Sequence, residues 1–193
     1  VQDILCGEFF VHPKKAALAV EIALHERQIA DTYAAADTCS LYISIPFCPT
    51  RCSYCSFVSY TSRKLLSLIP EYLDKLCEEI TETCSLLRAL GKKVICVYIG
   101  GGTPTTLDEM QLNRLLDTIC RNVDLDTLLE FTLEAGRPDT VTKEKLQSAL
   151  AYGVSRVSIN PQTLDDRILA CIGRKHTAED FYRAYVLARE SGI

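Results

Sequence analysis

The chain of 193 residues lacks the features that mark several large classes of protein. No apolar stretch approaches the ~20 residues of a membrane-spanning helix, so we expect no membrane span. The formal net charge is −4 and lysine and arginine are scattered, so we expect no nucleic-acid partner. There is one Cys-x2-Cys pair and no His-x3-His pair, so the paired ligands of a structural zinc site are missing.

Cysteine, by contrast, is abundant, with ten residues in the chain. In a small secreted protein this number would suggest a disulfide framework. Here Cys77 and Cys84 fall on one face of a predicted helix, and Cys96 lies inside an apolar predicted strand. Such positions are typical of small buried thiols. We therefore expect a reducing compartment, the cytoplasm, and a packing role for most of the other cysteines.

Three further cysteines, Cys48, Cys52 and Cys55, follow a predicted strand with the spacing Cys-x3-Cys-x2-Cys. Three thiolates on one short loop can hold three irons of a 4Fe-4S cluster and leave the fourth iron open to a small molecule. A closed zinc site needs a fourth ligand, and a redox pair of Cys52 and Cys55 would leave Cys48 without a role. The spacing alone leaves these alternatives open.

Residues 41–57, which contain these cysteines, resemble the cluster loop of radical S-adenosylmethionine (radical SAM) enzymes. The closer resemblance is to the oxygen-independent coproporphyrinogen III oxidase-like family, in its coproporphyrinogen dehydrogenase-like branch of Firmicutes-type bacteria. Later segments resemble this family in the same order, and together they cover residues 40–193. They are residues 100–105, residues 134–138, and residues 159–163 followed by residues 172–176.

Hydrophobic patterning predicts strands that alternate with helices, which indicates an α/β fold with a parallel sheet. In the third strand Glu130, Thr132 and Glu134 alternate with apolar residues, which favours a curved sheet with a polar inner face. The resemblance implies a partial (β/α) barrel of the radical SAM type, with about four of six βα units. The predicted strands are residues 41–47, 94–99, 128–134 and 154–160.

The predicted helices include residues 14–31, a helix from about Pro70, and a helix over 107–121 with a capping box of Thr106 and Glu109. Two more follow, over 143–152 and after the N-cap Thr177. We expect residues 1–39 to form an N-terminal helical segment and residues 40–193 the N-terminal part of a truncated radical SAM core. Neither end reads as a natural terminus, so we expect a fragment of a longer protein.

The resemblance implies roles for residues at the ends of the predicted strands. Cys48, Cys52 and Cys55 would be the metal ligands, and the other predicted site residues would bind S-adenosylmethionine. The glycine-rich segment could instead cradle a phosphate, but it lacks the Lys-Ser/Thr of a Walker loop. The cofactor-binding residues are Tyr42, Tyr54, Gly101, Gly102, Thr103, Glu134, Gln162 and Arg174.

Within this set the chemistry of each side chain suggests its contact. Glu134 could accept hydrogen bonds from the cofactor's amino or ribose groups, and Gln162 can both donate and accept. Arg174 could bind the methionine carboxylate through two hydrogen bonds. Each alone would more often be a solvated loop residue, and Tyr54 an ordinary loop aromatic. We expect His176 at the surface, and we assign no catalytic side chain.

The resemblance implies that the cluster reduces S-adenosylmethionine and releases a 5′-deoxyadenosyl radical. The first predicted function is oxidative decarboxylation of coproporphyrinogen III to protoporphyrinogen IX in haem biosynthesis, with an electron donor such as flavodoxin or ferredoxin. The alternative is a haem-binding chaperone on the same scaffold, and a third is a structural iron–sulfur or zinc protein. Decarboxylases of this family have a further cysteine where this chain has Phe57, which favours the chaperone branch.

Overall fold

The computed structural model describes residues 1–33, 35–57 and 59–193, which divide into two compact units, Val1–Thr38 and Cys39–Ile193. The first unit holds the helices α1 (Gln2–Gly7) and α2 (Pro13–Tyr33). Helix α2 contains the helix predicted over 14–31, whereas α1 was not predicted. Among the described residues, no helix combines the length and the apolar character needed to cross a membrane.

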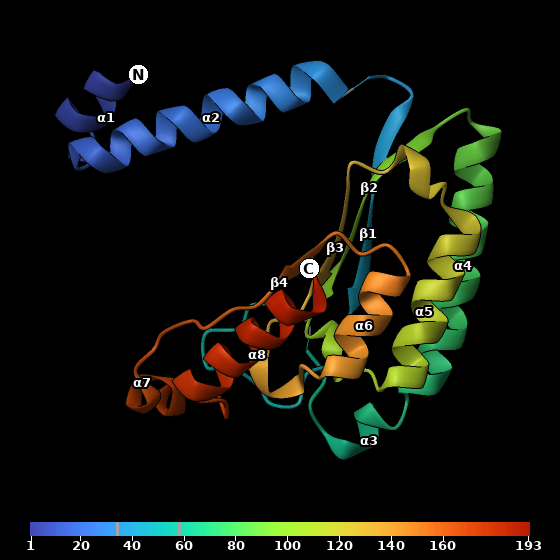
Figure 1. The fold of residues 1–193 in the computed structure, drawn as a ribbon. Helices are drawn as coiled ribbons and strands as arrows, with labels where there is room; N and C mark the ends of the chain where they lie inside the picture. Colours follow the sequence, from blue (N-terminus) through green and yellow to red (C-terminus); the bar gives the residue numbers. More distant parts are fainter. Residues whose placement is uncertain (34, 58) are drawn as a thin grey trace. The chain divides into compact units, whose positions relative to one another are not determined.

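The second unit contains one sheet of four parallel strands in the order β1-β2-β3-β4 (Figure 1). The α/β architecture predicted from the alternating pattern is therefore confirmed. The strands are β1 (Thr38–Ile45), β2 (Lys93–Gly101), β3 (Glu130–Glu134) and β4 (Arg156–Ser158). The helices are α3 (Arg63–Leu66), α4 (Ile69–Ala89), α5 (Glu109–Asn122), α6 (Lys143–Ala151), α7 (Asp166–Cys171) and α8 (Ala178–Ser191).

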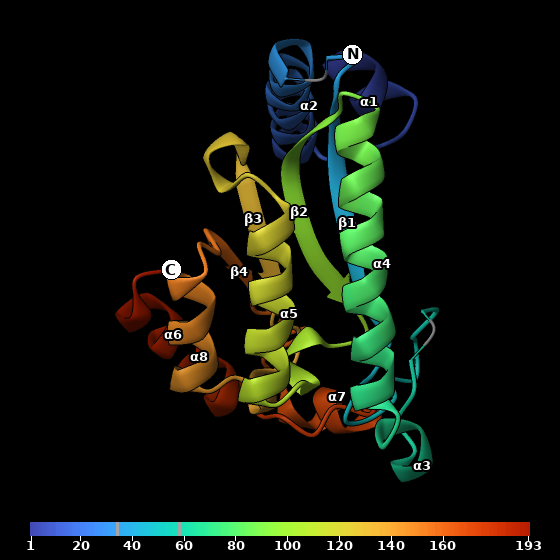
Figure 2. The same cartoon turned by 90° about the vertical axis from the view of Figure 1, so that its right-hand side faces the viewer.

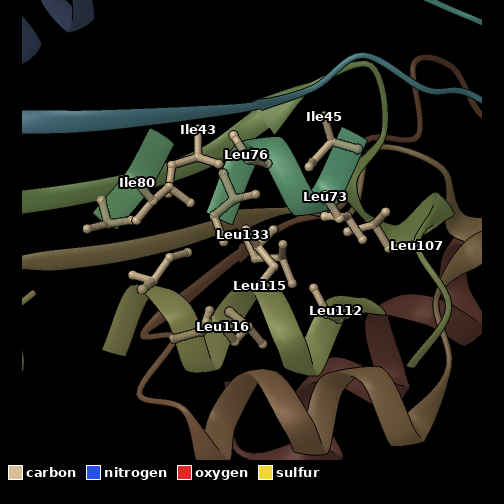
Figure 3. Packing of buried hydrophobic residues seen from close by; sticks show 14 of the residues in the cluster. Ile43, Ile45, Leu73, Leu76, Ile80, Leu107, Leu112, Leu115, Leu116 and Leu133 are labelled. Atoms are coloured by element: carbon tan, nitrogen blue, oxygen red, sulfur yellow. The ribbon is translucent and has the colours of Figure 1, made fainter. Parts of the chain in front are cut away.

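One face of the sheet is covered by helices α4, α5 and α6, which lie side by side in Figure 2. In β3, Phe131 and Leu133 point into this layer and are buried. Figure 3 shows Leu73 and Leu76 of α4 facing Leu115 of α5 across the same core. Each fully buried leucine or isoleucine contributes about 1.5–3 kcal/mol of transfer free energy, so this layer supplies much of the stability.

The opposite face of the sheet carries polar side chains, as the alternation predicted. Tyr98 of β2 lies in register with Thr132 of β3, which lies in register with Arg156 of β4. The Arg156 guanidinium pairs with Glu130 at 2.9 Å between nitrogen and oxygen. This face is therefore built for polar contacts rather than for a second layer of apolar packing.

Two local predictions differ from the structure. Helix α5 is capped by Asp108, which accepts from the Gln111 N–H while the Gln111 side chain accepts from the Asp108 N–H. The predicted box of Thr106 and Glu109 does not form, because residues 104–106 make a 3-10 turn that delays the helix. The first two glycines of the predicted glycine loop, Gly100 and Gly101, belong to strand β2 instead.

The chain after β2 passes very close to the end of β1. The Gly102 N–H donates to the Ile45 carbonyl and the Thr103 N–H to the Phe47 carbonyl, both at 2.8 Å. A Cβ atom on Gly102 would lie 2.7 Å from the Phe47 carbonyl oxygen. Gly101 has a φ of +104°, and its Cβ would lie 3.0 Å from the Ile45 nitrogen. Both positions therefore require glycine.

We predict that Gly102→Ala destabilises the protein by about 1–3 kcal/mol, the usual cost of overpacking, because the new methyl group meets backbone. Gly7→Ala is the matched control, since a Cβ atom there meets nothing within 4 Å. Chemical denaturation of the two variants measures the difference. Equal stability of Gly102→Ala and the wild type would show that the two strand ends can separate freely.

Candidate functional site

A cavity of about 190 Å³ lies at the carboxyl ends of the strands, where parallel α/β folds place their sites. Its wall includes the three cysteines of the loop after β1. Gly101, Gly102 and Thr103 contribute from the end of β2 and the turn after it. Glu134 at the end of β3 and residues after β4 close the remaining sides. Segments far apart in the sequence therefore meet in one space.

All three cysteine thiols are free and line this cavity. Cys48 is 6% exposed and Cys52 is 8% exposed, while Cys55 is half-buried. The Thr103 hydroxyl lies 3.3 Å from the Cys48 sulfur. Burial raises the pKa of the Cys48 thiol, and the Thr103 hydroxyl and the charge of Arg137 oppose that rise. The free thiolate of Cys48 is thus disfavoured until a cation binds it.

The loop that carries the cysteines is held by distant segments. The Arg137 guanidinium, after β3, donates to the Thr50 carbonyl at 2.6 Å and to the Cys52 sulfur at 3.0 Å. The Ser53 N–H donates to the carbonyl of Ile172, after α7, at 3.1 Å. These bonds fix the loop from two further βα units, so its shape is not a local property of the sequence.

Glu134 is oriented by a tyrosine that the sequence analysis did not select. The Tyr98 hydroxyl donates to the Glu134 carboxylate at 2.5 Å. Burial and this hydrogen bond raise the pKa of Tyr98 above its ordinary value, so the hydroxyl keeps its proton. The Tyr42 ring stacks on the Tyr98 ring, with centroids 5.8 Å apart and planes 12° apart. Tyr42 is therefore linked to Glu134 indirectly, because it packs against the ring of Tyr98, which is hydrogen-bonded to Glu134.

Arg174 has N–H groups that its two hydrogen bonds do not use. It donates to the Gly136 carbonyl at 2.5 Å and to the Tyr54 hydroxyl at 3.1 Å. Its Nε is buried and has no hydrogen-bond partner among the described residues. Such a group calls for a ligand or water. Gln162, on the same wall, has a φ of +62°, a strained backbone conformation that concentrates at functional sites.

Ten of the eleven predicted site residues line this one cavity. The exception is Tyr42, which lies beside it on the polar face of the sheet and is 58% exposed. Burial, opposed by the bond from Arg174, raises the pKa of Tyr54, so its hydroxyl stays protonated. The structure brings the residues together, and their binding roles remain predictions.

One expectation about this region was wrong. His176 is not at the surface but 2% exposed, with its Nε2 3.3 Å from the Pro161 carbonyl oxygen. Burial lowers the pKa of His176, so the ring is neutral near pH 7. Its charged neighbour Lys175 suggested exposure and is itself exposed, whereas His176 is buried.

Two residues were missed by the sequence analysis, Arg137 and Tyr98. Arg137 belongs to residues 134–138, one of the segments that resemble the family. It is buried, but the sequence of a single arginine after a strand does not indicate burial. Tyr98 could have been found, because it alternates with the apolar Val97 and Ile99 and so shares the polar face of β2.

The model of the radical SAM superfamily matches residues 42–193, which include every cavity residue described above. The chain belongs to the radical SAM superfamily. This superfamily uses a 4Fe-4S cluster and S-adenosylmethionine, as the cysteine spacing and its context indicated. The prediction of the family is therefore confirmed.

Relatives place this radical SAM chain near proteins of tetrapyrrole metabolism. It is 38% identical over 190 residues to the oxygen-independent coproporphyrinogen-III oxidase-like protein HemZ of Bacillus subtilis, covering 96% of this chain and 38% of HemZ. It is 40% identical over 155 residues to the heme chaperone HemW of the same species, covering 80% of this chain and 40% of HemW. The chain thus spans about two fifths of the length of these relatives.

The fold also resembles a solved structure, that of the radical SAM enzyme coproporphyrinogen III oxidase (HemN) from Escherichia coli. The TM-score is 0.69 at 28% sequence identity, and the match covers 84% of this chain and 36% of HemN. The predicted fold class, a partial (β/α) barrel of the radical SAM type, is confirmed by this likeness and by the parallel sheet.

The residues at the cavity fit the cofactors of the superfamily. Three sulfurs face one space, and the missing side chain of Gly102 leaves room beside Cys48, where a Cβ would lie 3.0 Å from the sulfur. Among the described residues, no three His, Cys, Asp or Glu side chains converge on a single metal ion. A 4Fe-4S cluster does not need three ligands on a single ion. It needs three thiolates that would each bind a different iron.

Proposed function

We propose that this chain binds a 4Fe-4S cluster through Cys48, Cys52 and Cys55 and activates S-adenosylmethionine in the adjoining cavity. The observation that carries the proposal is the meeting of three free thiols, an arginine with an unpaired buried donor and a glycine-lined wall in one space. When bound and reduced, the cluster supplies the electron that cleaves S-adenosylmethionine to a 5′-deoxyadenosyl radical.

The protein's own part is to bind, orient and exclude water. Arg174 would direct its unpaired Nε toward the methionine carboxylate, while its other nitrogens keep Tyr54 and Gly136 in place. Glu134 would accept from the amino or ribose groups, since Tyr98 engages one of its oxygens and leaves the other available. Gly101, Gly102, Thr103 and Gln162 would meet the cofactor from the same wall.

We further propose a tetrapyrrole as the substrate, with coproporphyrinogen III oxidised to protoporphyrinogen IX in haem biosynthesis. The support is the likeness to an oxidase-like protein along nearly the whole chain and to the fold of an oxidase. In this reaction the 5′-deoxyadenosyl radical would take a hydrogen atom from a propionate side chain, which would then lose CO2 and pass one electron to an acceptor to leave a vinyl group. The proposal includes a small electron donor, such as flavodoxin or ferredoxin, and a cytoplasmic site of action.

One observation favours a second candidate, a haem-binding chaperone. Phe57 stands where the decarboxylases of the family have a further cysteine, and this ring lines the cavity while remaining 64% exposed. The chain is also 40% identical to a heme chaperone over the matched residues. A chaperone would keep the cofactor site and carry the tetrapyrrole without turning it over.

The two candidates separate in a turnover assay of the full protein. Anaerobic incubation with S-adenosylmethionine, a reductant, an added one-electron acceptor and coproporphyrinogen III should yield protoporphyrinogen IX together with 5′-deoxyadenosine, because the radical takes its hydrogen atom from the substrate. Haem binding is titrated in parallel. Stoichiometric haem binding without any protoporphyrinogen IX would reject the decarboxylase and support the chaperone.

For the metal, we predict that anaerobic reconstitution loads about four irons and four sulfides, and that Cys→Ala at Cys48, Cys52 or Cys55 prevents this. Cys171→Ala is the matched control, because Cys171 is an exposed cysteine on α7 outside the cavity. Iron analysis and the visible absorbance of thiolate-bound iron measure the outcome. Stoichiometric zinc without that absorbance would contradict the cluster.

For the cofactor, we predict that Arg174→Ala weakens S-adenosylmethionine binding by about 1.5–3 kcal/mol, the range for a hydrogen bond to a charged group. Arg167→Ala is the control, since Arg167 has a 91% exposed side chain paired with Asp165. Calorimetry on the two reconstituted variants gives the difference. Unchanged affinity in Arg174→Ala would remove Arg174 from the site.

A further inference from the structure

Arg137 is a buried cation inside a wall of the cysteine cavity. Its residue is 2% exposed, and an arginine remains charged in any protein environment. Moving a charge out of water costs several kcal/mol unless partners compensate it. The groups around Arg137 should therefore include one that compensates its buried positive charge.

The partners of Arg137 are a carbonyl and a sulfur. Its NH2 group donates to the Thr50 carbonyl and, at 3.0 Å, to the Cys52 sulfur. Among the described residues, no carboxylate forms an ion pair with it. A neutral carbonyl does not balance a buried positive charge, so the matching negative charge has to come from the cysteine side of the cavity.

We propose that Arg137 is a positioning residue that binds the sulfur of Cys52 and sets the reduction potential of the cluster bound there. This inference rests on the cluster ligation proposed above. In this role Arg137 would act through Cys52 and not on S-adenosylmethionine itself. One terminal nitrogen of the guanidinium donates to both the Thr50 carbonyl and the Cys52 sulfur, so it fixes the loop and the ligand together.

The direction of the effect follows from charge. Three thiolates make the cluster site anionic, and reduction adds one more negative charge. A buried cation bonded to a ligand sulfur therefore stabilises the reduced state more than the oxidised state. Hydrogen bonds to sulfur and net charge are recognised determinants of cluster potential. Arg137 thus raises the potential and makes the cluster easier to reduce.

A merely structural role would show a different pattern. If Arg137 only anchored the loop through Thr50, its loss would lower stability or speed iron release while leaving the potential of intact clusters unchanged. The reduction potential separates the two roles. Arg51 offers the control, because it lies in the same loop with an exposed side chain, where solvent and salt screen its charge.

The experiment compares the wild type with Arg137→Gln, Arg137→Lys and Arg51→Gln after anaerobic reconstitution, without S-adenosylmethionine. Iron content and thermal unfolding establish that each protein is folded and loaded. A redox titration followed by absorbance and electron paramagnetic resonance gives the potential, and a chelator gives the rate of iron loss.

We expect Arg137→Gln to disfavour the reduced cluster about tenfold, a shift of about 59 mV to more negative potential for one electron. Arg51→Gln should leave the potential near that of the wild type. A loaded Arg137→Gln protein with the wild-type potential overturns the inference. If that variant fails to fold or load, Arg137→Lys decides. Its side chain is shorter, so the bond to the Cys52 sulfur should weaken. A loaded Arg137→Lys protein with a more negative potential than the wild type supports the inference, and one with the wild-type potential overturns it.

The experiment distinguishes a failure of the proposed cluster ligation from a failure of the proposed role of Arg137. A wild-type protein that binds no iron–sulfur cluster would reject the proposed ligation and this inference with it. A wild-type protein that binds the cluster, beside an Arg137→Gln protein of identical potential, would reject only the role of Arg137.

Discussion

The cavity depends on the close approach between the backbone after β2 and the end of β1. Gly102 can donate to the Ile45 carbonyl only because no side chain intervenes, and the same contact brings the Thr103 hydroxyl to the Cys48 sulfur. The strands themselves are fixed by the apolar layer beneath α4 and α5. The first cysteine is therefore held by the core of the fold, whereas Cys52 depends on Arg137 and on the loop contact of Ser53 with Ile172.

The two faces of the sheet divide stability from chemistry. Phe131 and Leu133 bury their side chains in the helical layer, and between them Thr132 faces the other way, in register with Tyr98. This arrangement lets Glu134, the last residue of β3, emerge at the cavity with Tyr98 already bonded to it. A substitution on the apolar face acts on folding, whereas one at Tyr98 on the polar face acts on the orientation of Glu134.

Much of the site was predictable, because its residues follow strand ends that the apolar pattern reveals. The parallel sheet brings Cys48, Thr103 and Glu134 to one edge, whatever the loops between them do. The burial of Arg137 and His176 was not predictable, since it depends on how loops from different βα units cover one another. The cap of α5 at Asp108 was missed for a local reason, a 3-10 turn that the pattern of apolar residues does not encode.

The likeness to both an oxidase-like protein and a chaperone follows from what the described residues do. In the proposed function Cys48, Glu134 and Arg174 would face a cluster and a cofactor that both kinds of protein share, so these residues would carry no information about the fate of a tetrapyrrole. Phe57 differs, because it lines the cavity and because the family resemblance implies a further cysteine at this position in the decarboxylases. An apolar ring there can pack against a flat macrocycle but can neither donate a proton nor bind a metal. Under the proposed function, the choice between turning a tetrapyrrole over and carrying it would therefore depend on the residues that meet the macrocycle, and not on those that bind the cofactor.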